Sequence, residues 1–120
     1  MDDRARRALR RGHLVDITTT GRRSGQEHRV ELVFHNLDGR IFISGRPGRR
    51  GWYANLVAHP DFTFHLKGPI AADLPARARP VTDRAERERV LAPIAAGWRY
   101  DLGVMVADAP LVEVLFDEAA

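Results

Sequence analysis

Apolar and polar residues alternate along several stretches of the chain, and this period of two predicts strands with one buried face. The clearest example is residues 28–37, whose apolar face carries Val30, Leu32 and Phe34. Asp38-Gly39 separates this stretch from a second β-rich one at 40–45. The pair favours a two-residue type I′ turn, because both central positions need positive φ. We therefore expect an antiparallel hairpin.

Four further stretches have the composition of strands. They are residues 13–20, 61–67, 70–81 and 111–116. β-Branched residues or alternating aromatic residues mark most of them. Pro75 lies in the middle of the third. Because proline cannot donate to a sheet ladder, we expect an edge or a bend at that point.

The N-terminal stretch 2–11 contains good helix formers but only one large apolar residue, Leu9. We expect a solvated or frayed helical arm that has little to bury and ends at Gly12. The alternative is a basic surface helix that touches a membrane or another anionic partner.

Two further helices are predicted. Residues 52–59 have the length of a two-turn helix stopped by Pro60. Asp83 followed by Glu86 is a helix N-cap signature. The helix after it has an apolar stripe of Val90, Leu91, Ile94 and Ala95. Pro93 is expected to kink or end this helix.

The order of these elements favours an α+β protein that is mainly β, built on an antiparallel barrel or sheet. Most connections are as short as hairpins, and only two can hold a crossover helix, so a parallel βαβ architecture is not expected. Residues 1–12 are interpreted as the helical arm and residues 13–120 as a single domain.

Composition narrows the class of protein. The 120 residues are 44% hydrophobic and 29% charged, which is typical of a globular domain. There is no cysteine, which excludes disulfides, thiol catalysis and cysteine-ligated metals. No apolar run has the length of a membrane span, and Met1-Asp2-Asp3-Arg4 does not begin a signal peptide. We expect a cytoplasmic protein.

Charge is distributed unevenly along the chain. Residues 1–60 hold 12 arginines against 6 acidic residues, whereas residues 61–120 hold 7 basic residues against 10 acidic ones. We therefore expect the first half to carry an anion-facing surface.

The five histidines show no metal-ligand spacing, and neither serine lies in a GxSxG motif. No metal site and no serine nucleophile are predicted. The stretch 18–25 instead combines Gly21 and Gly25 with two arginines and hydroxyl residues. These groups suit a phosphate cradle, and the alternative is an ordinary solvated turn.

A second basic loop at 46–50 is followed directly by Trp52, Tyr53 and Asn55. Arginines beside an indole, a phenol and an amide could bind a flat anionic ligand. The alternative interpretation is a core tryptophan next to solvated arginines.

The segments LVDITTTGRRSGQEHRVELVFHNLDGRIFISG and GWYANLVAHPDFTFHLKG resemble the deazaflavin (F420)-dependent nitroreductase and quinone reductase family over residues 13–68. The resemblance implies a split β-barrel of mostly antiparallel strands with a short N-terminal helix and two further helices. It also implies hydride transfer between reduced coenzyme F420 and a small planar acceptor of the quinone, nitroaromatic or enone type.

The resemblance implies cofactor-binding roles for Arg22, Arg23, Ser24, Gly25, Val30, Glu31, Leu32, Val33, Gly45, Arg46, Trp52 and Asn55. Residues 22–24 are implied to hold the coenzyme phosphate and oligoglutamate tail, and residues 30–33 to line the ring edge. Residues 45–46 are implied to pass near the deazaflavin, while Trp52 and Asn55 close the pocket. The ring itself supplies the hydride, so no protein nucleophile or metal is needed.

The chain departs from the family pattern on the predicted strand at 28–37 and after it. Glu31 and Val33 replace a proline and an aromatic residue that many members carry, and the segment between Ser44 and Trp52 is short. Tyr100 is the one tyrosine in a position to match the substrate-protonating tyrosines of nitro-compound reducers. It is the catalytic candidate.

Two other functions fit the residues. A split barrel that binds FMN or haem would use a similar pocket, because FMN also offers a tricyclic ring and a phosphate. A small basic β-barrel that binds nucleic acid or membrane would explain the arginine-rich arm, but the strands lack paired exposed aromatics for base stacking. We expect a small planar acceptor as the substrate and a second copy of the chain in a homodimer. We also expect a peripheral membrane contact through the arm, and we expect no nucleic acid partner.

Overall fold

The computed structural model describes residues 1–11 and 13–117, and the following elements lie in these ranges. Six strands form a closed barrel in the order β1-β2-β3-β6-β5-β4, and all neighbours pair antiparallel. The strands are β1 (Leu14–Thr20), β2 (Glu27–Leu37), β3 (Arg40–Ser44), β4 (Asp61–Leu66), β5 (Ala72–Pro80) and β6 (Leu111–Phe116). The predicted α+β class with a mainly antiparallel barrel is confirmed.

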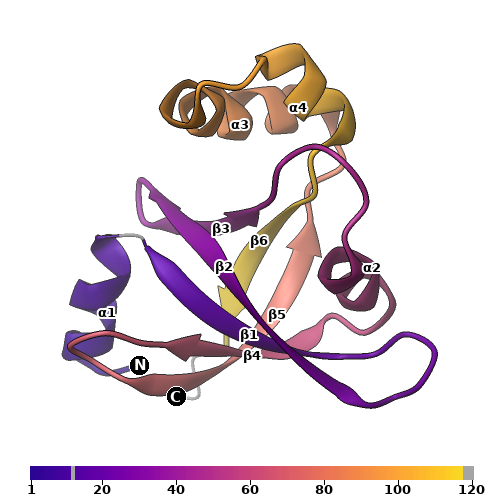
Figure 1. Ribbon diagram of the computed structural model, residues 1–120. Coiled ribbons are helices and arrows are strands. Elements are labelled where there is room, and N and C mark those ends of the chain that lie inside the picture. Colours follow the sequence, from indigo (N-terminus) through magenta and orange to yellow (C-terminus); the bar gives the residue numbers. More distant parts are fainter. Residues whose placement is uncertain (12, 118–120) are drawn as a thin grey trace.

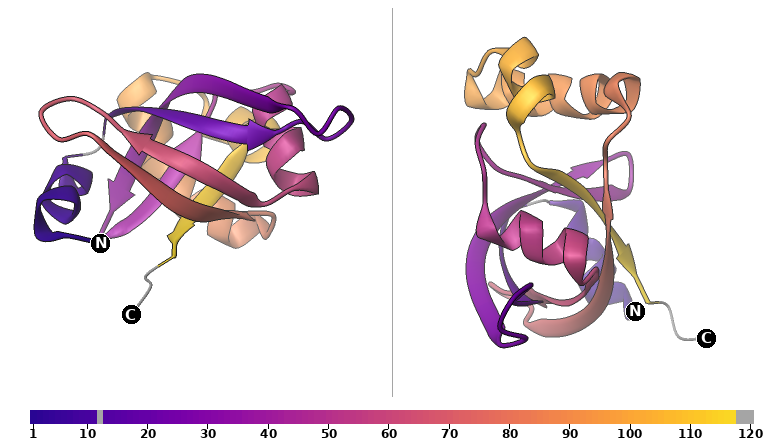
Figure 2. Two further views of the ribbon diagram at one scale, coloured as in Figure 1. Left: turned by 90° about the horizontal axis from the view of Figure 1, so that it is seen from below. Right: turned by 90° about the vertical axis from the view of Figure 1, so that its right-hand side faces the viewer.

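The helices are α1 (Asp3–Arg10), α2 (Gly51–Ala58), α3 (Arg84–Trp98) and α4 (Leu102–Asp108). Viewed along the barrel, α2 lies across one open end and α1 lies behind the opposite end (Figure 2, right). Helices α3 and α4 form a layer against the outer side of the barrel (Figure 1). The structure therefore has one helix more than the sequence predicted.

Helix α1 contributes to the core. Ala5 and Leu9 are 3% and 5% exposed, and they belong to the same buried cluster as the barrel interior. The side chain of Asn36 also donates to the backbone oxygen of Leu9 at 3.0 Å. The helix itself was predicted correctly, but the expectation that it has little to bury was wrong. Its predicted end at Gly12 lies outside the described residues.

The barrel interior is filled by the inward faces of the strands together with residues from α1 and α2. Its largest members include Ile17, Phe34, Ile43, Leu56 and Phe64. A separate cluster lies outside the barrel, where α3 and α4 pack against Phe42 and Leu111. The fold thus has one core inside the barrel and another beneath the α3–α4 layer.

The hairpin between β2 and β3 has the predicted turn, with φ of 55° at Asp38 and 88° at Gly39. Pro75 does not mark an edge, because β5 pairs with both β4 and β6. The Pro75 oxygen accepts from the amide of Asp117, beyond the end of β6. The backbone N–H that Pro75 lacks would lie where the β5–β6 ladder ends, so its absence costs the sheet little stability.

Pro93 does not end α3, which continues to Trp98. Ile94 and Ala95 are buried after the proline, as Val90 and Leu91 are before it. Packing on both sides therefore keeps the segment helical in spite of the lost hydrogen bond.

Helix α4 was missed because Gly103 and two valines weaken the local helical preference. Its one clear signal is Asp101, whose carboxylate accepts from the amide of Val104 at 2.9 Å. This is an N-cap hydrogen bond.

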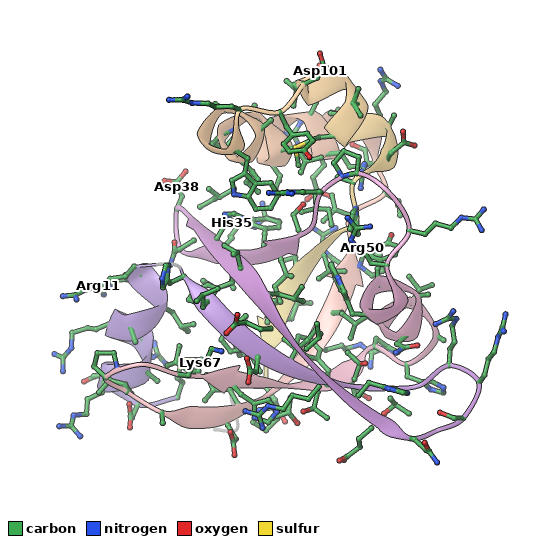
Figure 3. All side chains as sticks on the ribbon, viewed as in Figure 1. Arg11, His35, Asp38, Arg50, Lys67 and Asp101 are labelled. Carbon is green, nitrogen blue, oxygen red and sulfur yellow. The ribbon has the colours of Figure 1, made fainter. Side chains whose placement is uncertain are left out.

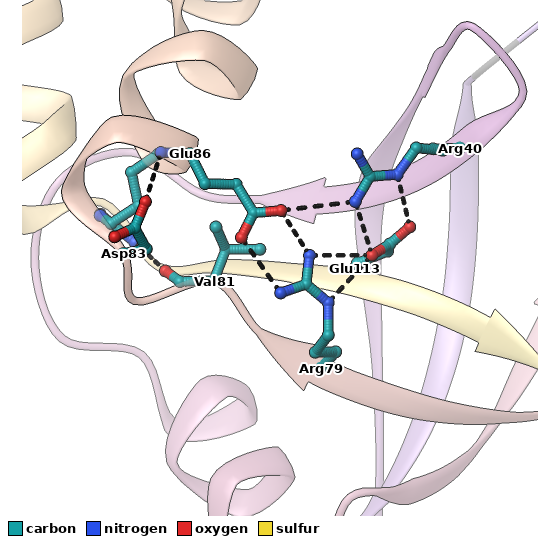
Figure 4. A network of polar contacts seen from close by, with 7 residues as sticks. Arg40, Arg79, Val81, Asp83, Glu86 and Glu113 are labelled. Carbon is teal, nitrogen blue, oxygen red and sulfur yellow. Dashed lines mark hydrogen bonds and ion pairs between the residues drawn. The ribbon is translucent and has the colours of Figure 1, made fainter.

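A four-residue ionic network connects α3 to the barrel (Figure 4). Arg40 forms a bidentate pair with Glu113, with both N–O distances at 2.9 Å. Arg79 contacts the same carboxylate and also Glu86 on α3, at 2.7 Å for the shorter bond. The arginines hold the pKa values of Glu86 and Glu113 below the usual glutamate range. The network is balanced in charge, with Glu113 almost fully buried.

Candidate functional site

A cavity of about 440 Å³ lies where α2 covers the barrel, beside the β1–β2 connection. It is lined by Thr19, Gly21, Arg22, Arg23, Ser24, His28, Val30, Gly51, Trp52 and Asn55. These residues come from β1, the β1–β2 connection, β2 and the start of α2. Segments that are more than 20 residues apart in sequence thus meet at one end of the barrel.

The β1–β2 connection is a compact turn held by its own backbone. The amide of Gly21 donates to the oxygen of Gln26 at 2.7 Å, and the amide of Gly25 donates to the oxygen of Gly21 at 2.9 Å. Gly25 has a φ of 71°, a left-handed value that favours glycine. The side-chain hydroxyl oxygen of Ser24 accepts a hydrogen bond from the backbone amide of Gln26. These hydrogen bonds and the left-handed glycine define the shape of the turn.

Gly21 is required by a close approach of side chains. A Cβ at this position would lie 2.6 Å from Ser24 Oγ and 2.8 Å from His28 Nε2. Only a glycine lets both polar groups lie against the turn at the cavity wall.

Asn55 links α2 to this turn. It is 6% exposed, and its Oδ1 accepts from both the backbone amide and the Nη1 atom of Arg22, each at 3.1 Å. Its Nδ2 donates to Oγ1 of the buried Thr19 at 3.2 Å. The amide side chain thereby orients the Arg22 guanidinium without neutralising its charge.

The electrostatic character of the cavity follows from its lining. It includes Arg22, Arg23 and His28, and no acidic residue is among the described residues that line it. Hydroxyl donors and the first residues of α2 add to the polar side, while Val30 and the largely buried Trp52 form an apolar wall. This combination suits a ligand with an anionic group attached to an apolar ring.

Six of the predicted cofactor-binding residues line this cavity together. They are Arg22, Arg23, Ser24, Val30, Trp52 and Asn55. Gly25 shapes the turn beside them. Leu32 packs against the barrel core, two residues after Val30 on the same strand face. Glu31 lies on the opposite face, where it forms an ion pair with Lys67. Figure 3 labels Lys67.

The remaining predicted residues lie near the loop that leads from β3 to α2. A Cβ at Gly45 would lie 3.2 Å from Pro110 and 3.7 Å from both Arg50 and the Trp52 ring, and Gly45 is not among the described residues that line the cavity. The Arg46 guanidinium carbon is 5.9 Å from the centre of the Tyr100 ring. Val33, like Glu31, alternates with the inward-facing residues of β2. Gly45 therefore lies near Trp52, and the Arg46 side chain lies against Tyr100.

The resemblance gave no cofactor-binding role to four lining residues, namely Thr19, Gly21, His28 and Gly51. Thr19 and Gly21 lie in the stretch 18–25 that the sequence offered as a phosphate cradle, whereas His28 and Gly51 were missed. Strand alternation gives a signal for two of the four. Thr19 continues the inward alternation of Val15 and Ile17, and His28 precedes Val30 by two residues on the same strand face. Within the described residues, no group of three histidine or acidic side chains could hold a metal.

Residues 4–112 match the profile of the family described as F420H(2)-dependent quinone reductase. The chain belongs to this family. The match extends well beyond the segments that carried the resemblance in sequence, and it confirms that interpretation. Members of the F420H2-dependent quinone reductase family transfer hydride from F420H2 to an acceptor, so coenzyme F420 is the cofactor.

Solved structures support the fold. A structure of an F420-H2 dependent reductase (FDR-A) is 22% identical, with a TM-score of 0.63, covering 84% of this chain and 92% of that one. A putative pyridoxamine 5'-phosphate oxidase from Listeria innocua is 12% identical, with a TM-score of 0.75 and coverage of 97% and 93%. A protein described as a domain-swapped dimer is 22% identical, with a TM-score of 0.60 and coverage of 93% and 94%. The fold is the split barrel of these proteins.

The cavity fits the coenzyme of this F420H2-dependent quinone reductase family. F420 carries a phosphate and an oligoglutamate tail, which are the anionic groups that an acid-free lining with two arginines attracts. The deazaflavin ring is flat and has apolar faces, which can pack against the apolar wall formed by Trp52 and Val30. When bound, the reduced ring supplies the hydride, and the protein contributes binding and orientation.

Proposed function

We propose that this chain reduces a small planar acceptor of the quinone, nitroaromatic or enone type, with F420H2 held at the cavity between α2 and the β1–β2 turn. The observation that carries the proposal is the pairing of Asn55 with Arg22. A buried amide that orients an arginine leaves its positive charge available to a ligand, whereas a carboxylate in its place would neutralise it.

The residues have separate roles in this proposal. Arg22, Arg23 and Ser24 bind the phosphate and tail carboxylates, and His28 adds a donor beside them. Trp52 and Val30 support the apolar part of the coenzyme, and Asn55 keeps Arg22 in position. The ring is proposed to extend from Trp52 toward residues 45–46.

The acceptor is proposed to bind beside Tyr100, which Arg46 contacts. Tyr100 is 39% exposed, so its phenol is open to a small molecule and to solvent. The nearby Arg46 guanidinium contacts the Tyr100 ring by a cation–π interaction. In this position Tyr100 donates a proton to the acceptor as hydride arrives on another atom. When the acceptor is a quinone, addition of one hydride and one proton gives the hydroquinone.

A binding titration tests the cofactor assignment. Oligoglutamyl F420, FMN and haemin are titrated in parallel into the wild type and into the Arg22→Ala/Arg23→Ala variant, followed by tryptophan and cofactor fluorescence. We expect the wild type to prefer F420 and the variant to lose at least about tenfold in affinity, or about 1.4 kcal/mol. Arg84→Ala/Arg89→Ala removes the same charge from α3 and is the matched control. Equal losses in both variants, or preference for FMN or haemin, would refute the assignment.

We also propose that any contact with a membrane surface is electrostatic. No helix in the described part of the chain could span a membrane. The apolar residues of α1 are already used in the barrel core, and the exposed residues of the helix are Asp3 and four arginines. Binding to vesicles of anionic lipid should therefore disappear at high salt. The cytoplasm is the proposed compartment.

A homodimer is the proposed assembly, supported by the similar protein described as a domain-swapped dimer. Light scattering of the purified protein at several concentrations tests this. A monomer mass at all concentrations would contradict it.

A further inference from the structure

A second and larger cavity, of about 630 Å³, lies on the other side of the α2 N-terminus. Its walls come from the loop before α2, from α2 itself, from the β5–α3 connection and from the α4–β6 connection. Tyr53 lines this cavity, whereas its neighbour Trp52 lines the coenzyme cavity. The two cavities share no lining residue, although their linings adjoin at Arg50 and Gly51 and again at Trp52 and Tyr53.

One wall is fixed by Arg87 of α3. Its guanidinium donates to the backbone oxygens of Ala109 at 2.6 Å and of Val81 and Val106 at 2.8 Å. A weaker bond goes to the oxygen of Met105 at 3.2 Å. Carbonyl oxygens have partial charges only, so these bonds position the guanidinium and leave its net positive charge in the wall.

Two further arginines reach the cavity from the loop before α2. They are Arg49 and Arg50, and Arg50, which Figure 3 labels, donates from Nη1 to the backbone oxygen of Arg49 at 2.9 Å. Neither arginine takes part in an ion pair in the part of the chain that the structure describes. Asp108 is the one acidic residue among the described lining residues, and it is exposed. The formal charge of the lining is therefore positive.

The remaining lining is largely apolar. Val81 is fully buried, Ala109 is 4% exposed, and Tyr53 is half-buried. The volume is within the range of about 300 to 1,000 Å³ that small-molecule pockets occupy. A cavity with an apolar floor and unpaired arginines at its mouth matches a small molecule that has an apolar ring and one anionic group.

We propose that this cavity is a second ligand site, which takes a small aryl phosphate or aryl carboxylate. The anionic group binds Arg49 and Arg50, and the ring packs against Val81 and Tyr53. Arg87 adds attraction from behind the ring. The site is distinct from the coenzyme cavity, and the inference does not depend on which cofactor the other cavity holds.

An NMR titration with phenyl phosphate tests the site. We expect saturable shifts at the amides of Gly48, Tyr53 and Ala109, and these shifts should persist in Arg22→Ala/Arg23→Ala whether or not phenyl phosphate also binds in the coenzyme cavity. Benzyl alcohol, which keeps the ring and lacks the charge, and inorganic phosphate, which lacks the ring, should each bind at least about tenfold more weakly.

Removing a positive or a negative charge from the lining should change the affinity for phenyl phosphate in opposite directions. Arg49→Ala/Arg50→Ala should weaken phenyl phosphate at least about tenfold, and Asp108→Asn should strengthen it severalfold. Arg22→Ala/Arg23→Ala is the matched control and should leave its affinity unchanged, while the spectra report whether each variant is folded. Shifts confined to the coenzyme cavity, or affinity that does not respond to Arg49 and Arg50, would overturn the proposal.

Discussion

At the scale of single residues, the candidate coenzyme site depends on small side chains and polar contacts that lie close together. Gly21 admits Ser24 and His28, and Asn55 joins Arg22 to Thr19. The contacts of Gly21 are local in sequence, but the pairing of Asn55 with Arg22 crosses 33 positions. No pattern within one segment could have revealed it.

Gly21→Ala tests the close approach directly. The added methyl group must displace Ser24 Oγ and His28 Nε2, which are ends of flexible side chains, so the fold should survive. We expect F420 affinity to fall by about tenfold and the melting temperature to change by only a few degrees, which is about 1 kcal/mol or less.

Gly97→Ala is its control, because a Cβ there has open space on the α3 surface. It should leave F420 affinity unchanged and leave stability equal or slightly higher. Unchanged F420 affinity in Gly21→Ala would show that Ser24 and His28 do not bind the coenzyme.

At the scale of elements, helices close or cover the barrel, and their roles depend on contacts that span long stretches of sequence. The sequence pattern placed the strands and the β2–β3 turn correctly, because alternation and the Asp-Gly pair are local signals. It could not show that α1 fits the open end of a barrel. One large apolar residue, Leu9, together with Ala5 is enough there, since the strands and α2 supply the rest of the core.

Leu9→Ala measures the contribution of α1. Because Leu9 is 5% exposed within the barrel cluster, we expect a loss of about 2 to 4 kcal/mol in the free energy of unfolding. Val57→Ala on α2 removes an apolar side chain that is 55% exposed, and it should change stability by less than about 0.5 kcal/mol. Equal, small effects of the two substitutions in urea unfolding would show that α1 is a solvated arm after all.

The network of Arg40, Arg79, Glu86 and Glu113 should make stability depend on pH. The pKa of Glu113 is lowered first by its hydrogen bonds with Arg40, and that of Glu86 first by Arg79, below the ordinary value of 4.5. The stabilisation is therefore fully present above that value and is lost as pH falls through the lowered pKa values of the folded state. Unfolding free energy should be steady near neutral pH and decline in acid.

Glu113→Gln tests this network and keeps the size of the side chain. At pH 7 it should cost about 1 to 2 kcal/mol, since it weakens two partly exposed arginine pairs on a buried acceptor. Its stability should also decline less steeply in acid than that of the wild type. Parallel pH profiles for the two proteins, measured by urea unfolding, would contradict the role of the network.

At the scale of the whole molecule, the excess of positive charge in residues 1–60 has a structural counterpart. The coenzyme cavity takes all its arginines from that half, and its lining comes from β1, β2 and α2. Sequence reasoning identified the two loops because glycine and arginine are concentrated in them. It did not reveal the second cavity, whose walls come from both halves of the chain, including α4, which the pattern did not predict.

The family assignment and the cavity together lead to one central claim, that this chain transfers hydride from F420H2 bound between α2 and the β1–β2 turn. Single-turnover oxidation of F420H2 by a soluble quinone, followed by the return of the oxidised deazaflavin absorbance, tests it most directly. The account predicts rapid oxidation with the wild type and with Arg84→Ala/Arg89→Ala. With Arg22→Ala/Arg23→Ala the rate at low coenzyme concentration should fall at least about tenfold. Wild-type oxidation no faster than without protein, or equal rates for the two double variants, would contradict the claim.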